Sequence, residues 1–222
     1  MREENKQVCQ EIVQTCLNLT TSKLVEGPWG NVSARLPDDL VAITPSGRDY
    51  NSLTWQDIAI IDLQGNIKES LYNPSSEAFL HLSIYKNRPD IKAIIHTHSI
   101  YASAFAVAQK PIMAVIEDVV QIVGGEVAVA PYALPGTQEL AQNAVEYLHK
   151  KNAVLLANHG AVACGRTLAE AFVVASIVEK TAHIALFSQL LNPNIQPLSS
   201  NDIEVLRTNY LEKYSKQQLV ED

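Results

Sequence analysis

Apolar residues follow two alternating periods along this chain. Helices are expected where apolar residues recur every three or four positions, over residues 4–23, 102–108, 138–150, 167–191 and 201–216. A further helix, about eleven residues long, is expected to begin after Glu77. Strands are expected at short apolar runs bounded by turn residues: over 31–36, 40–44, 58–62, 91–99, 111–116, 126–130 and 153–158, with 161–163 continuing the last of them. This interleaving predicts an α/β fold in layers, and because no linker or repeat interrupts it, residues 1–222 are expected to form one domain.

Composition narrows the classes of protein and of partner. Of the 222 residues 47% are hydrophobic and 18% are charged, which is enough apolar content for a packed core. The formal net charge is −7 and no run of Lys and Arg is present, so we expect no nucleic-acid partner. An anionic small molecule is still possible, because a metal and backbone N–H groups can make one site locally positive.

The cysteines and the apolar runs indicate a cytoplasmic protein with no membrane partner. Cys9, Cys16 and Cys164 are odd in number and have no Cys-x-x-Cys spacing, so we expect buried thiols in a reducing compartment. The first ten residues lack the apolar segment of a signal peptide. Continuous apolar runs such as 171–177 are too short to span a bilayer.

Three histidines stand at the ends of expected strands. His96 and His98 end an apolar strand, and with a side-chain period of two both imidazoles point to the same face. Two imidazoles held that close repel each other if protonated, whereas a divalent cation satisfies both. His159 ends a second apolar strand, and Gly160 after it permits close approach. Together they predict an open metal site with three neutral ligands, suited to Lewis-acid catalysis.

The other histidines fit ordinary positions. His149 and His183 lie on expected helices as packing or surface residues. His81 comes one turn after Glu77 and shares a helix face with it, so we expect a packing or supporting role near the site.

Hydroxyls and glycines at loop ends predict an anion site. Ser75, Ser76 and Glu77 lie at a helix start, where hydroxyls and free N–H groups suit a phosphate. Helix capping by a serine and the helix dipole also explain these residues without any ligand. The pairs Gly30-Asn31 and Ser46-Gly47 offer further N–H and hydroxyl donors.

The order of these motifs resembles the class II aldolase/adducin family, and is most similar to its L-fuculose-1-phosphate aldolase branch. The resemblance covers roughly residues 5–190 and is carried by Gly30-Asn31-Val32-Ser33-Ala34-Arg35, Ile43-Thr44-Pro45-Ser46-Gly47, Pro74-Ser75-Ser76-Glu77, His96-Thr97-His98 and Asn158-His159-Gly160. It implies a three-layer α/β/α fold with a mixed, mainly antiparallel central sheet. It also implies a C4 homotetramer with active sites at subunit interfaces.

The resemblance also implies roles for single residues. His96, His98, His159 and Glu77 would hold one divalent metal per subunit, with zinc the first expectation and manganese or cobalt the alternatives. Glu77 would in addition act as general acid/base. The phosphate of the substrate would be held by Gly30, Asn31, Ser46, Gly47, Ser75 and Ser76.

The chemistry of such a site agrees with a metal-dependent aldehyde-lyase. Cleavage of a ketose 1-phosphate to dihydroxyacetone phosphate and an aldehyde leaves an enediolate, whose charge lies on two neighbouring oxygens. A metal that chelates both oxygens stabilises that charge. A glutamate displaced from the metal can then move a proton at the nucleophilic carbon.

One departure concerns the substrate. The fuculose-phosphate branch has a tyrosine from a neighbouring subunit just before the pair that matches Gly124-Gly125, and here Glu117 or Asp118 takes its place. Either acid would serve catalysis by protonating the leaving alkoxide or by holding a substrate hydroxyl. The substrate is therefore expected to be L-fuculose 1-phosphate or a 5-deoxypentulose 1-phosphate. Tyr210 and Tyr214 near the C-terminus are candidates to cover the site or to pack the last helix.

Other functions stay open. A sugar-phosphate epimerase, dehydratase or decarboxylase would fit the same scaffold, although the pentulose-phosphate epimerase branch has Asp where this chain has Glu77. A non-catalytic, adducin-like interaction module would lack the metal ligands that this chain keeps. A metallo-β-lactamase would need Asp at the position of Ile100, and an amidohydrolase barrel would need a longer chain with an early His-x-His.

Overall fold

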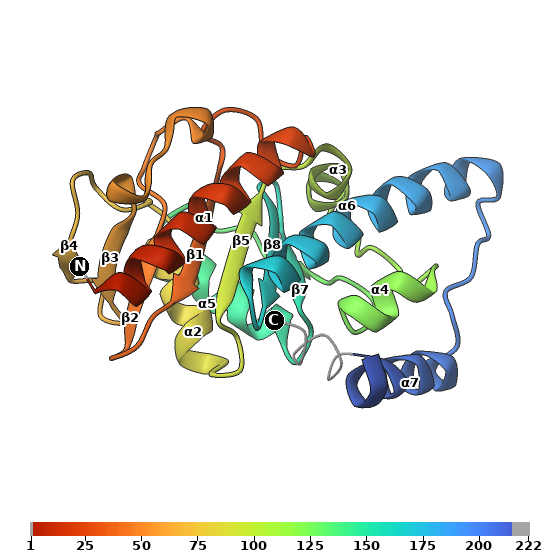
Figure 1. Ribbon diagram of the computed structural model, residues 1–222. Coiled ribbons are helices and arrows are strands. Elements are labelled where there is room, and N and C mark those ends of the chain that lie inside the picture. The colour runs from red at the N-terminus through yellow and green to blue at the C-terminus, as the bar shows by residue number, and fades with distance from the viewer. Residues whose placement is uncertain (1, 215–222) are drawn as a thin grey trace.

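One mixed sheet runs through the molecule. The computed structural model describes residues 2–214 (Figure 1). Eight strands pair in the order β4-β3-β2-β1-β5-β8-β7-β6. Their bounds are β1 Gly30–Arg35, β2 Leu40–Ile43, β3 Ala59–Asp62, β4 Ile67–Glu69, β5 Ala93–Thr97, β6 Val129–Ala130, β7 Ala153–Leu156 and β8 Gly160–Gly165. Every pair is antiparallel except β6 with β7, as a mixed, mainly antiparallel sheet requires.

Helices cover both faces of this sheet. They are α1 Glu3–Thr21, α2 Ala78–Asn87, α3 Ile100–Ala108, α4 Glu117–Ile122, α5 Gln138–Leu148, α6 Leu168–Leu191 and α7 Ser200–Asn209, with short turns at Tyr50–Ser52, Trp55–Asp57 and Tyr210–Tyr214. Figure 1 shows α1 and α6 in front of the sheet and α2 and α5 behind it. Each face has its own cluster of buried apolar side chains. The three-layer α/β/α prediction is confirmed.

Local sequence explains why several elements begin and end where they do. The β1–β2 hairpin turns at Asp38 and Asp39, whose φ angles of 60° and 55° have the sign of a type I′ turn. The Thr167 side chain accepts a hydrogen bond from the N–H of Glu170 and so caps α6. The two carboxylate oxygens of Glu179 accept from the N–H groups of Tyr101 and Ala102, which ties α6 to the start of α3.

Three expectations from the sequence are wrong in detail. Residues 161–163 do not continue the preceding strand, because Asn158 adopts a left-handed φ of 56° and the chain turns back into β8. The strand expected over 111–116 is reduced to one bridge between Ile112 and Val127, and of 126–130 only the last two residues form β6. The short elements α4 and β4 were not expected; β4 is an exposed edge strand with little apolar signal.

Helix α6, Leu168–Leu191, has nearly the bounds expected from the sequence and is strongly apolar. Its 24 residues, with a mean hydropathy of 1.4 over the most apolar window, are long enough to cross a membrane. In the fold it packs on β8 and α3, and Ala171, Val174 and Val178 are buried there. Length and composition alone do not separate such a helix from the core helix of a globular protein, and 39% of that window is buried inside the fold.

Candidate active site

Two antiparallel strands bring the three expected histidines together. His96 lies on β5, directly opposite Val162 of β8, and His98 and His159 lie just beyond the same ends of β5 and β8. The candidate ligand atoms of the three imidazoles all lie within 4.8 Å of one another. The ring centroids are 4.7 to 4.9 Å apart. We call His96, His98 and His159 the histidine cluster.

Burial and one hydrogen bond set the state of this cluster. His96 is fully buried, and its Nδ1 lies 2.9 Å from the carbonyl oxygen of Ala161, to which it donates. Its Nε2 therefore carries a lone pair and lies 2.9 Å from Nε2 of His98. Burial lowers the pKa of all three imidazoles, most strongly at His96, where the neighbouring imidazoles lower it further. The cluster is therefore neutral and presents lone pairs.

Gly160 allows the strands to come this close. A Cβ at this position would lie 2.3 Å from the carbonyl oxygen of Thr97 and 2.8 Å from Cδ2 of His98. Both distances are far below ordinary van der Waals contact, so no larger residue fits without moving β8 away from β5.

Glu77 closes the cluster on its remaining side. Its Oε2 lies 3.3 Å from Nε2 of His96, and its Oε1 lies 3.4 Å from Nε2 of His159. The side chain is only 10% exposed, yet among the described residues Oε1 has no hydrogen-bond partner, and neither has Nδ1 of His159. Three neutral imidazoles and the unpartnered Oε1 of Glu77, converging at one point, fit a divalent metal. Their roles as ligands remain predictions.

The loops expected to bind phosphate lie beside one another. Pro45 and Pro74 form an isolated antiparallel bridge, and the N–H of Ser46 donates to the Asn73 carbonyl at 3.0 Å. The side chains at the mouth of the two loops are exposed, namely Ser46 and Ser76, and the backbone of Gly47 is exposed with them.

Three residues of the expected phosphate site have other partners. The hydroxyl of Ser75 is buried and accepts from the N–H of Glu77 at 3.2 Å, which fixes the entry to α2. The side chain of Asn31 is buried and turned to Glu77 rather than to the loop mouth. Gly30 is required by packing, because a Cβ there would lie 2.8 Å from the His96 carbonyl oxygen.

Two neighbours of the site were not found by sequence reasoning. Gly136 approaches Ser76 so closely that a Cβ would lie 2.9 Å from the Ser76 carbonyl oxygen. The indole of Trp29, 66% exposed, stacks at 6.5 Å on the imidazole of His98. A cavity of about 250 Å³ lies there, lined by Trp29, His98, Leu24, Ile100 and other residues. Only the loop position of Trp29, next to Gly30, is visible as a signal in the sequence.

Glu117 and Asp118 lie elsewhere. They begin α4, and Asp118 Oδ2 pairs with Nζ of Lys180 on α6 at 2.5 Å, with both side chains about half exposed. Within residues 2–214, neither acid forms a hydrogen bond or an ion pair with the histidine cluster or with Glu77. Arg207 of α7 donates to the Ile122 carbonyl at 3.3 Å and holds the other end of α4.

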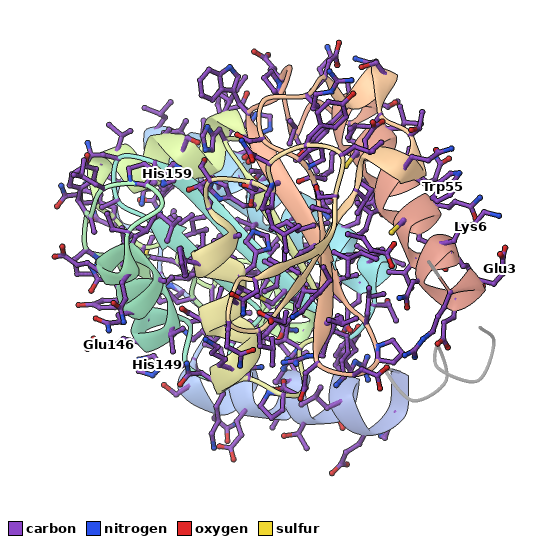
Figure 2. The ribbon with its side chains drawn as sticks, turned by 90° about the vertical axis from the view of Figure 1, so that its left-hand side faces the viewer. Glu3, Lys6, Trp55, Glu146, His149 and His159 are labelled. Carbon is purple, nitrogen blue, oxygen red and sulfur yellow. The ribbon has the colours of Figure 1, made fainter. Side chains whose placement is uncertain are left out.

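The remaining candidates are peripheral. Tyr210 lies beside the guanidinium of Arg207, 5.9 Å from ring centroid to Cζ, and the side chain of Tyr214 is outside the described part of the structure. His183 stacks on Tyr101 at 3.9 Å. Figure 2 shows His149 beside Glu146, at the opposite end of the molecule from His159. Both histidines are exposed, in agreement with the expectation of ordinary packing or surface positions.

Comparison with known proteins identifies relatives that share this fold. Residues 10–186 match the model of the class II aldolase and adducin N-terminal domain. An L-fuculose phosphate aldolase of Escherichia coli O6:H1 is 35% identical over 95% of both chains. A 5-deoxy-D-ribulose 1-phosphate aldolase of Bacillus thuringiensis serovar kurstaki is 39% identical over 79% of this chain and 82% of its own. A solved L-fuculose 1-phosphate aldolase superposes with a TM-score of 0.89 at 36% identity, covering 92% of this chain and 96% of the other.

Proposed function

The chain belongs to the class II aldolase and adducin family, and on that premise we propose that it is a metal-dependent lyase that cleaves a ketose 1-phosphate. The products would be dihydroxyacetone phosphate and an aldehyde. The observation that carries the proposal is the convergence of three neutral imidazoles and the carboxylate of Glu77 at one buried point. The names of the relatives support the same reaction class.

The histidine cluster and Glu77 would hold one divalent metal per subunit. Neutral imidazoles with one carboxylate suit zinc first, and manganese or cobalt as alternatives. When bound, the metal supplies a Lewis acid beside the carbonyl and hydroxyl oxygens of the substrate. Because His96, His98 and His159 are neutral, only Glu77 offsets the charge of the cation, and a net positive charge remains available to those oxygens.

The protein's own groups would bind the phosphate and move the proton. Ser46, Gly47 and Ser76 at the mouth of the two loops would bind the phosphate, with Gly30, Asn31 and Ser75 shaping the site behind them. Phosphate binding fixes the position of the reacting carbons. Glu77, nearly excluded from water, would move the proton at the hydroxymethyl carbon of dihydroxyacetone phosphate, which lies across the carbonyl from the phosphorylated carbon.

The aldehyde end would be completed by a second copy of the chain. Glu117 or Asp118, remote from the cluster in its own subunit, would reach the site of a neighbour in a C4 homotetramer. Trp29 gives this side of the site an apolar wall, which favours a small or methyl-terminated aldehyde. L-fuculose 1-phosphate and a 5-deoxypentulose 1-phosphate both meet that requirement. We further propose one domain over residues 1–222 and a cytoplasmic location.

A substrate panel tests this function. Purified protein loaded with zinc, manganese or cobalt is incubated with several ketose 1-phosphates, and dihydroxyacetone phosphate is measured with a coupled dehydrogenase. Protein treated with a chelator and then reloaded is the control. Release of dihydroxyacetone phosphate that depends on the metal is expected. Conversion of a sugar phosphate without its release, with metal bound, would instead favour an epimerase, dehydratase or decarboxylase.

A further inference from the structure

A row of buried polar side chains packs behind Glu77, and most of them have no part in the function proposed above. Glu77, His81 and Tyr85 are spaced by four residues and form one stripe at the start of and along α2. Asn31 and Ser33, spaced by two, lie on one face of β1 beneath that stripe. All five are less than 9% exposed.

Hydrogen bonds join these residues into one chain. Asn31 Nδ2 donates to Glu77 Oε2 at 2.9 Å, and Asn31 Oδ1 lies 2.5 Å from His81 Nε2. His81 Nδ1 lies 2.6 Å from the Ser33 hydroxyl, which lies 2.8 Å from the Tyr85 hydroxyl. We call Tyr85, Ser33, His81 and Asn31 the polar chain.

The carboxylate of Glu77 sets the direction of every donor in the polar chain. Because a carboxylate only accepts, Asn31 must turn its NH₂ group to Glu77 and its oxygen to His81. His81 must then carry its proton on Nε2 and accept at Nδ1 from Ser33. Burial lowers the pKa of His81 to about 3, so the ring is neutral and has one proton to place. Because the Ser33 proton goes to His81, Tyr85 donates to Ser33 at 2.8 Å, in preference to its other acceptor, the Lys92 carbonyl at 3.4 Å.

The result is a carboxylate with two unequal oxygens. Oε2 is held by Asn31, whereas Oε1 has no hydrogen-bond partner among the described residues and faces His159. An oxygen that is free but held in place is what proton transfer at a fixed carbon requires.

We propose that His81 is a positioning residue for Glu77, acting through the amide of Asn31. This proposal rests on the proposed function and gives the amide of Asn31 a role at the acid/base. His81 donates from Nε2, fixes the amide, and so keeps Oε2 occupied and Oε1 directed at the substrate carbon. A purely structural His81 would affect stability but not proton transfer in protein that is folded and metal-bound.

The tautomer of His81 provides the first test and needs no metal and no turnover. Two-bond ¹H–¹⁵N spectra of the metal-free, ¹⁵N-histidine-labelled protein distinguish the two neutral forms, with a His81→Gln sample to assign the signal. The Nε2–H tautomer is expected. The Nδ1–H tautomer, or a protonated ring at neutral pH, would overturn the proposal.

Exchange of a carbon-bound proton provides the second test. Metal-loaded enzyme in D₂O should exchange one hydroxymethyl proton of dihydroxyacetone phosphate without any aldehyde, which isolates the step assigned to Glu77. In His81→Leu this exchange should fall by about 10- to 100-fold, while bound metal and the KM for dihydroxyacetone phosphate stay near wild type. His81→Gln, whose amide nitrogen can replace Nε2 as donor, should recover most of the loss.

The results of these experiments distinguish a failure of the His81 proposal from a failure of the proposed function. Normal exchange in folded, metal-bound His81→Leu would overturn the role of His81 alone, and so would equal losses in the Leu and Gln variants. A wild-type enzyme that binds metal but neither exchanges the proton nor cleaves any ketose 1-phosphate would remove the proposed function and this inference with it. If His81→Leu does not fold, Ser33→Ala takes its place, because the serine hydroxyl is the donor that orients the His81 ring. A smaller loss of exchange is then expected. Unchanged exchange in Ser33→Ala would contradict the proposal.

Discussion

The two acidic regions assigned to catalysis differ in almost every physical respect. Glu77, at the start of α2, is nearly buried between the histidine cluster and the polar chain, beside the neighbouring strands β1, β5 and β8. Glu117 and Asp118 begin a helix of six residues at the surface, where Asp118 pairs with a half-exposed lysine. The first region holds its geometry within one chain. The second has side chains free to meet another molecule.

This difference matches the demands of the two ends of the proposed reaction. A metal and a proton transfer need atoms fixed within a few tenths of an ångström, which rigid strands and buried hydrogen bonds supply. Choice of the aldehyde needs shape and a donor or acceptor that can vary between relatives. Surface residues at a subunit interface supply these without disturbing the core. Substitutions should therefore act differently in the two regions.

The largest effect is expected from His96→Ala. It removes the fully buried ligand of the cluster, so metal content and activity should both fall, with activity below about a thousandth of wild type. Metal is measured by mass spectrometry on dialysed protein and activity by release of dihydroxyacetone phosphate. His149→Ala, at the opposite end of the molecule, is the matched control and should retain both. Full metal occupancy in His96→Ala would contradict the ligand assignment.

Gly160→Ala should come next, with a loss of stability as well as metal. The added Cβ forces β8 away from Thr97 and His98, which should cost about 3 kcal/mol or more of unfolding free energy. Thermal unfolding with and without added zinc measures the effect. In Gly65→Ala the new methyl group meets only ordinary contacts, so this control should lose about 1 kcal/mol for its positive φ. An unchanged midpoint for Gly160→Ala would show that the strands have room there.

A moderate effect confined to turnover is expected from Glu117→Gln or Asp118→Asn. Whichever acid serves the neighbouring site should lose about 10- to 100-fold in kcat/KM when neutralised. Metal content should stay unchanged, because neither residue contacts the cluster in its own chain. The exposed pair of Asp118 with Lys180 contributes at most about 1 kcal/mol, so the unfolding midpoint should hardly move. A kcat/KM within twofold of wild type for both variants would remove α4 from the site.

Mixing of two impaired variants sharpens this prediction. If sites are shared between neighbours, refolding His96→Ala together with the weakened α4 variant should rebuild intact sites, about a quarter of all sites at an equal ratio. Each variant refolded alone is the control. No recovered activity from a mixture that forms hybrid assemblies would place the whole site within one chain.

The smallest effect is expected from Trp29→Ala. Loss of the apolar wall beside His98 should raise the KM of substrates with a methyl-terminated aldehyde half by about 3- to 10-fold, since roughly one to two buried methylene equivalents are lost. Substrates with a hydroxylated end should change less. Steady-state kinetics on both kinds of substrate measure the difference. Equal changes for both would mean that Trp29 does not contact that end.

The sequence predicted the parts of this site that follow from strand periodicity. His96, His98 and His159 could be placed together because strand ends and a period of two decide where they point. The turn at Asn158 could not be predicted, because a single asparagine before His159 and Gly160 does not by itself reveal that the chain reverses there with a left-handed φ.

Side-chain direction was a further limit. The sequence predicts Asn31 as part of the phosphate site. The residues next to Asn31 in the sequence do not reveal that its side-chain amide forms hydrogen bonds with the buried His81 and Glu77. Likewise, the place of Glu117 and Asp118 relative to the cluster depends on a six-residue helix and on a neighbouring chain. Neither is encoded in local periodicity.

The most direct test of the central claim is Glu77→Gln in metal-loaded protein. The amide keeps the shape of the carboxylate but cannot take the proton. We expect bound metal and affinity for inorganic phosphate to stay within a few-fold of wild type, while cleavage of the best ketose 1-phosphate falls by about 10²- to 10⁴-fold. Calorimetry measures the phosphate, and release of dihydroxyacetone phosphate measures cleavage. Near-normal turnover in this variant would contradict the assignment of Glu77 as the acid/base.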